Sequence, residues 1–83
     1  MPTKRSKDQI ILEILTTCLE EGASKTRIVY QVNLNFHTVD VHLGLLHKKG
    51  LLEAIPGVHM LYKTTPKGKK ALKCLKVIDA IYS

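Results

Sequence analysis

A chain of 83 residues that is 45% hydrophobic and 24% charged can form one domain with one modest core. One Phe, three Tyr and no Trp leave few side chains to line a deep pocket, so the composition disfavours an enzyme that acts on a small molecule. Thirteen Lys and Arg residues against seven Asp and Glu give a net charge of +6, which predicts attraction to polyanions.

The N-terminal part of the chain predicts a basic arm followed by a helix. Residues 1–5 are expected to form a flexible arm, and residues 6–83 a single domain. Ser6 is placed to cap the first helix, and the Glu-Glu-Gly sequence at 20–22 is expected to end it. The apolar residues of this helix recur at helical spacing: Ile10, Ile11, Ile14, Leu15, Cys18 and Leu19.

Two further helices are predicted, with a short break between them. Ser24 caps the second, which runs from residue 25 to about residue 32, and Asn35 caps the third, which ends before Gly50. The third helix carries one apolar stripe, formed by Phe36, Val39, Leu43 and Leu46.

A hairpin and a last helix complete the order of elements. Residues 51–55 and 58–64 are expected to be strands that flank a type II turn at Pro56-Gly57. Thr65 then caps a helix over residues 66–82, with a proline at its first position. Three helices, a two-stranded β wing and a C-terminal helix predict an α+β, mostly α, winged helix-turn-helix domain.

Two sequence motifs carry a family likeness. The stretch Lys25-Thr26-Arg27-Ile28-x-Tyr30-x-x-Asn33-Leu34 resembles that of the archaeal 10a-type chromatin proteins and related small winged-helix transcriptional regulators. The stretch Tyr62-x-Thr64-Thr65-x-x-Gly68 resembles the junction between wing and last helix that many winged-helix families share. The resemblance covers about residues 6–76, and it implies a DNA-binding dimer joined through the C-terminal helix.

The chain departs from the family pattern in two respects. Thr64 stands where an apolar residue, often Leu, is usual. The last helix is predicted to have roughly 17 residues, or about 25 Å at 1.5 Å each. Relatives with a long dimerising coiled coil have a longer one, so a dimer of this chain is expected to use a shorter contact.

The third helix of a helix-turn-helix enters the major groove, where its outward residues reach the bases. Its first two turns lack Arg and Lys, the residues that most often read guanine, so weak sequence selectivity is expected. The outward residues of this helix are His37, Thr38, Asp40, Val41, Leu45 and Lys48. The residues predicted to contact DNA are Lys25, Arg27, His37, Thr38, Val41, Lys48, Lys49, Lys63, Lys67, Lys69 and Lys70.

Some of these assignments have structural alternatives. Arg27 can form a salt bridge with Glu20 or Glu21 instead of contacting a phosphate. Six lysines lie between Lys63 and Lys76 without an acidic residue among them, which favours a polyanionic partner. The alternative is that these lysines are the ordinary solubilising charge of an exposed helix face.

Dimerisation is predicted for the last helix because its apolar residues continue to the end of the chain. The residues predicted to form the dimer contact are Leu75, Ile78, Ile81 and Tyr82. The alternative is that this apolar face packs entirely on the first helix of its own domain, which needs a cover.

The sequence does not favour a disulfide, a membrane span, a metal site or catalysis. Cys18 and Cys74 are expected to be buried free thiols of a reducing compartment, because neither belongs to a paired motif. The chain contains neither an apolar run near the ~20 residues of a membrane span nor a signal peptide, so a cytoplasmic, nucleoid-associated location is expected. No metal or other cofactor is predicted, because the four histidines lack the i, i+4 spacing of a helical metal site. No enzymatic activity is predicted, because nothing in the sequence indicates a base beside Cys or Ser with a third group to orient it.

A second class of function stays open. The same fold can serve as a protein–protein interaction module, in which Val41 and Leu45 meet a protein instead of DNA. Asp40 and a hairpin tip without Arg or Lys favour that reading, whereas the net charge opposes it. Binding of single-stranded RNA is a weaker alternative, since few exposed aromatic side chains are expected to stack on bases.

Overall fold

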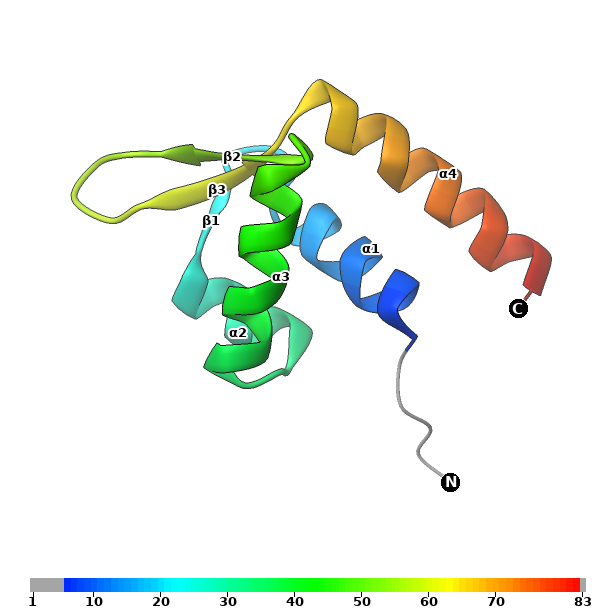
Figure 1. Cartoon of the computed structure of the whole chain (residues 1–83), viewed down its shortest axis with the longest axis horizontal. Coiled ribbons are helices and arrows are strands. Elements are labelled where there is room, and N and C mark those ends of the chain that lie inside the picture. The colour runs from blue at the N-terminus through cyan, green and yellow to red at the C-terminus, as the bar shows by residue number, and fades with distance from the viewer. Residues whose placement is uncertain (1–5, 83) are drawn as a thin grey trace.

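The computed structural model describes the backbone of residues 6–82 and the side chains of residues 6–77; the expected basic arm at 1–5 lies outside this part. The described chain forms helices and one antiparallel sheet with the strand order β1-β3-β2 (Figure 1). The elements are α1 (Lys7–Thr17), β1 (Ala23–Ser24), α2 (Lys25–Val32), α3 (Phe36–Lys48), β2 (Leu52–Ile55), β3 (Leu61–Thr64) and α4 (Pro66–Tyr82).

Each helix begins at the residue that the sequence predicts. Ser6, Ser24, Asn35 and Thr65 each accept a hydrogen bond from the backbone N–H three residues further on, at 3.1, 3.2, 2.7 and 3.0 Å respectively. Such bonds satisfy N–H groups that have no partner inside the helix. These four caps therefore set the helix starts by local chemistry.

The end of α1 differs from the prediction, because the helix stops at Thr17 and not at 20–22. The chain turns at Gly22, which has a φ of +86°, and enters the unpredicted strand β1. Ala23 of β1 pairs with Tyr62 of β3. A strand of two residues is too short to show the alternation by which strands are recognised in a sequence.

The hairpin is also shorter than predicted. β2 and β3 pair from Leu52 opposite Thr64 to Ile55 opposite Leu61, which leaves residues 56–60 as a loop. The expected strand start at 58 is wrong, since Val58 is 97% exposed and lies in this loop. The expected type II turn is also wrong, because that turn needs a positive φ at Gly57 and the structure shows none there.

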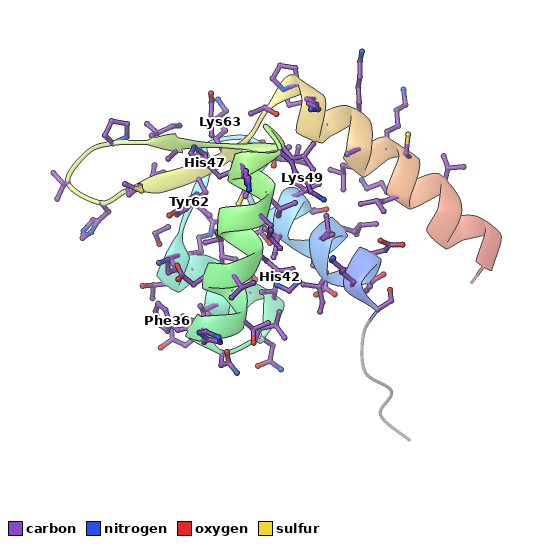
Figure 2. The ribbon with its side chains drawn as sticks, viewed as in Figure 1. Phe36, His42, His47, Lys49, Tyr62 and Lys63 are labelled. Carbon is purple, nitrogen blue, oxygen red and sulfur yellow. The ribbon has the colours of Figure 1, made fainter. Side chains whose placement is uncertain are left out.

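The core lies where α1, α2 and α3 meet the sheet and the first half of α4. Two expectations for it are wrong. Phe36 is 53% exposed, because it is the first residue of α3 and stands at the free end of that helix (Figure 2). Cys74 is exposed on the outer side of α4. The buried core residues are Ile14, Leu15, Cys18, Ala23, Ile28, Val32, Val39, Leu43, Leu46, Leu52 and Leu72.

Cys18 is buried, as predicted, and both cysteines are free thiols. Burial raises the pKa of the Cys18 thiol to about 12, and the positive charge of Arg27 opposes this shift. The thiol of Cys18 is therefore protonated at neutral pH and behaves as a small apolar core residue.

The junction between β3 and α4 explains why Thr64 departs from the family pattern. Its side chain is 2% exposed, and its hydroxyl donates a 2.7 Å hydrogen bond to the carbonyl oxygen of Leu15. Its backbone N–H also donates to the carbonyl oxygen of Cys18, at 2.9 Å. A carbonyl at the end of a helix lacks an intrahelical partner, so Thr64 supplies one that an apolar side chain cannot.

Gly68, in the first turn of α4, lets this helix approach the start of β2. A Cβ at this position would overlap the carbonyl oxygen of Leu51 and lie 2.7 Å from Cγ2 of Thr64. The second family motif is thus a steric and hydrogen-bonding unit, which attaches α4 to both α1 and the sheet.

Candidate nucleic-acid interface

The outer side of α3 is solvent-exposed, as the sequence predicts. Val41 is 47% exposed and Leu45 is 42% exposed. His37, Asp40 and Lys48 are exposed beside them, and Thr38 is half-buried. In Figure 1, α3 starts beside α2 and ends at the base of the β2–β3 hairpin, so the helix and the hairpin border one side of the molecule.

A salt bridge that the sequence analysis missed joins α2 to α3. Nζ of Lys25 lies 2.5 Å from Oδ1 of Asp40, and both side chains are partly exposed. The hydrogen bond from Lys25 holds the pKa of Asp40 below its usual value, and the same bond raises the pKa of Lys25. Lys25 thus neutralises the acidic group on the outer side of α3. Its own amino group, which was predicted to contact a phosphate, is bonded to Asp40 instead. The two residues are 15 positions apart, a separation that no local spacing rule predicts.

Arg27 remains available to contact an anionic partner such as a phosphate. It is exposed in the first turn of α2 and lines a shallow polar depression together with Glu20 and Glu21. Among the side chains that the structure describes, however, neither glutamate forms a salt bridge with Arg27.

Three of the predicted lysines gather at the C-terminal end of α3. Lys48 is the last residue of the helix, Lys49 follows it, and Lys67 of α4 lies beside Gly50. Their charge complements the negative end of the α3 dipole. All three lysines are exposed, so they can also contact an anionic partner.

Lys63 lies apart from this group. Consecutive residues of a strand point to opposite faces, and Figure 2 shows Tyr62 on the α3 side of the hairpin and Lys63 on the other side. Lys63 stands opposite Glu53 in the register of β2 and β3, a cross-strand position where unlike charges stabilise the sheet.

The two remaining lysines, Lys69 and Lys70, are exposed near the start of α4, which leads away from α3 (Figure 1). Lys70 borders an open apolar surface formed with Lys73, Cys74 and Val77. The residues predicted to contact DNA therefore do not form one patch. One part surrounds α3, and another belongs to the hairpin and α4.

A groove between α3 and the hairpin was not predicted. Its volume is about 370 Å³. α3 contributes Asp40, Leu43, Gly44 and His47 to its walls, and the hairpin contributes Ala54, Met60 and Tyr62. A glycine in the middle of an amphipathic helix was the one sequence signal that could have drawn attention to it.

The described residues were expected to hold no metal ion and no membrane-spanning segment. They contain no group of three or more His, Cys, Asp or Glu side chains placed to hold a metal. His42 is engaged by its own helix, with Nδ1 2.9 Å from the carbonyl oxygen of Thr38. Within the same part of the chain, every helix falls short of the length and apolar character of a membrane span.

Three helices with a short turn between α2 and α3, followed by the β2–β3 hairpin and α4, define a winged helix-turn-helix domain. The chain belongs to the winged helix-turn-helix family, which it matches over residues 4–82. The predicted fold and family likeness are thereby confirmed. A match to a winged helix-turn-helix domain also agrees with the expectation that the chain is not an enzyme.

Similar proteins include an archaeal relative and two solved structures. An uncharacterized protein of Methanocaldococcus jannaschii is 36% identical over 80 residues, which are 95% of this chain and 36% of that protein. This chain thus spans about a third of that relative's length. Sso10a-2, a DNA-binding protein from Sulfolobus solfataricus, is 26% identical with a TM-score of 0.86, over 94% of this chain and 82% of its own. The transcriptional regulator BldR from the same organism is 20% identical with a TM-score of 0.79, over 88% of this chain and 56% of its own.

Proposed function

We propose that this chain binds double-stranded DNA, with α3 in the major groove and most contacts made to the phosphate backbone. The observation that carries the proposal is the exposed outer side of α3, whose one acidic group is neutralised by Lys25. The domain carries a net charge of +6. Sso10a-2, the similar structure at 26% identity, is a DNA-binding protein, which supports the same role here. A chromatin-associated protein or a transcriptional regulator of the nucleoid fits this activity.

The residues around α3 favour backbone contacts over base reading. Val41 can contact only a thymine methyl group, while His37 and Thr38 can bond to phosphates or to base edges. The exposed basic groups lie in the first turn of α2, with Arg27, and at the C-terminal end of α3, with Lys48. Contacts to phosphates position a protein on DNA without reading its sequence.

The salt dependence of binding tests this proposal. If about five to six phosphates are neutralised per protomer, the slope of log affinity against log salt is near −5, and affinity falls about a thousandfold between about 50 and 200 mM salt. Fluorescence anisotropy with two unrelated duplexes measures both the slope and the sequence preference. A flat salt response, or no binding at 50 mM salt, contradicts the proposal.

A matched pair of charge reversals locates the contact. Lys48→Glu with Lys49→Glu alters the end of α3, and Lys69→Glu with Lys70→Glu makes the same change of charge on α4. We expect both pairs to weaken binding to every duplex alike, and the α3 pair to weaken it more. A larger loss for the α4 pair would place the main phosphate contact on α4.

A protein-interaction module is the second candidate, because apolar side chains are exposed on α2 and α3. Tyr30 is 81% exposed and Phe36 is 53% exposed, and Val41 and Leu45 lie on the same helix as Phe36. Contiguous exposed apolar side chains on a protein surface often indicate a site of protein–protein interaction. Failure of the salt experiment would favour this candidate.

A homodimer joined through α4 is part of the proposal. Leu75 is half-buried and packs against the domain's own core, whereas Cys74 and Val77 are exposed on the outer side of the helix. The other predicted dimer residues, Ile78, Ile81 and Tyr82, lie outside the side chains that the structure describes. Because this apolar side of α4 is exposed, we expect a second copy of the chain to pack against it.

Sedimentation equilibrium tests the dimer. We expect the mass of two chains at micromolar concentration, and dissociation in Val77→Glu, which places a charge on the exposed apolar side of α4. Lys76→Glu is the control, because it changes more charge on an exposed neighbouring residue that does not line this surface. A strict monomer at all concentrations rules the dimer out.

A further inference from the structure

Gly44 occupies a position where a glycine weakens the helix. It lies in the interior of α3, where glycine is less favourable than alanine because the unfolded chain loses more conformational freedom. Its backbone does not have a positive φ, and a Cβ built on it would meet nothing within 4 Å. Gly22 and Gly68 differ in this respect, because a Cβ on either would meet backbone atoms at close range. The fold of the domain alone therefore gives no reason for the glycine at 44.

The bare helix surface at Gly44 faces the groove between α3 and the hairpin. Gly44 and Ala54 contribute its smallest side chains, one from each wall. His47 and Tyr62 border the same groove, and Figure 2 shows them near each other on α3 and on the hairpin. The walls of the groove therefore carry their least side-chain volume at Gly44 and Ala54.

We propose that this groove receives the sugar–phosphate backbone of one DNA strand, and that Gly44 marks the point where the strand comes closest to α3. The proposal rests on the DNA-binding function proposed above and names the part of the surface that the strand occupies. Glycine is the residue that allows another backbone or a ligand to approach a helix most closely.

The chemistry of the groove matches a deoxyribose–phosphate chain. Ala54 and Met60 offer apolar surface to the sugar, above the buried Leu43. The imidazole of His47 and the hydroxyl of Tyr62 can donate hydrogen bonds to phosphate oxygens.

The described residues that line the groove include no Lys or Arg, so the attraction of an anionic strand comes from charge elsewhere on the domain. Asp40, the acidic residue of the groove, is paired with Lys25, so its carboxylate does not face the strand as an isolated negative charge. The net charge of +6 draws an anionic strand toward the domain. A polyanion with an apolar sugar edge therefore fits both the polar rim and the apolar walls.

Substitution of Gly44 separates this role from a structural one. We expect Gly44→Ala to raise the melting temperature by about 4 °C, because helix propensity improves and no clash arises. We expect the same variant to bind duplex DNA at least about tenfold more weakly at a fixed salt concentration, and Gly44→Leu more weakly still. A gain in stability with a loss of affinity is not what a purely structural glycine would produce.

The control is Gln31→Ala, an exposed residue of α2 outside the groove, which should leave the affinity unchanged. If the wild type binds DNA and both Gly44 variants bind it equally well, the groove proposal is overturned while the proposed function stands. If the wild type binds no duplex, the proposed function itself fails. A loss that is large for one duplex and absent for an unrelated one would mean that the groove meets base edges, which overturns the backbone assignment.

Discussion

Gly68→Ala is expected to destabilise the domain by about 3 kcal/mol, near the upper end of the cost of overpacking a core. The added methyl group would overlap the carbonyl oxygen of Leu51 and press on Cγ2 of Thr64. A backbone carbonyl cannot rotate away as a flexible side chain can. The same carbonyl also accepts the hydrogen bond of the Thr65 N–H, at 3.1 Å, so relief of the clash would disturb the start of α4.

Chemical denaturation of Gly68→Ala and of Gly44→Ala tests this expectation with one substitution at two positions. Both glycines lie in helices, but Gly44 has open space around it. We expect Gly44→Ala to gain about 0.5–1 kcal/mol from helix propensity, so the two variants should differ in sign. Equal stabilities for the two variants would show that α4 does not need its close approach to β2.

Thr64→Val is expected to cost about 1–3 kcal/mol, the penalty of leaving a buried polar group without its hydrogen bond. Valine keeps the shape of threonine and its preference for strands, but it has no hydroxyl to donate to the Leu15 carbonyl. That carbonyl lies at the end of α1, where the helix provides no further N–H groups. The loss should therefore loosen the attachment of α1 to β3.

Thr16→Val is the matched control for this change. The hydroxyl of Thr16 also donates a 2.7 Å hydrogen bond to a carbonyl oxygen, that of Leu12, but this residue is exposed and water can replace the bond. We expect its unfolding free energy to change by no more than about 0.5 kcal/mol. Thr64→Ser, which keeps the hydroxyl, should retain the hydrogen bond and lose only the packing of a methyl group. Equal losses in Thr64→Val and Thr16→Val would contradict the structural role of the Thr64 hydroxyl.

The helix starts were predictable because capping is local. Ser6, Ser24, Asn35 and Thr65 each bond to an N–H group three residues away, so the signal lies within one turn of sequence. The errors fall where the outcome depends on distant partners. Strand β1 exists because β3 is available to pair with it, and the end of α1 is set by the turn that leads into that pairing.

The exposed positions were harder to predict than the buried ones. Phe36 continues the apolar stripe of α3 in sequence, but the helix begins beyond the edge of the core. Cys74 belongs to an apolar pattern in α4 that has two sides, of which the domain covers only the one carrying Leu72 and Leu75. Periodicity identifies an apolar face, but the neighbouring element decides whether that face is covered.

The sequence by itself determined the winged helix-turn-helix fold, the outward side of α3 and the excess of positive charge. These properties follow from caps, from periodicity and from composition, which are read within a few residues or summed over the whole chain. The tertiary structure alone decided that Lys25 neutralises Asp40, that Lys63 lies away from α3, and that Gly44 opens onto a groove. Such contacts join residues far apart in the chain, and only the packing of helices against the sheet brings them together.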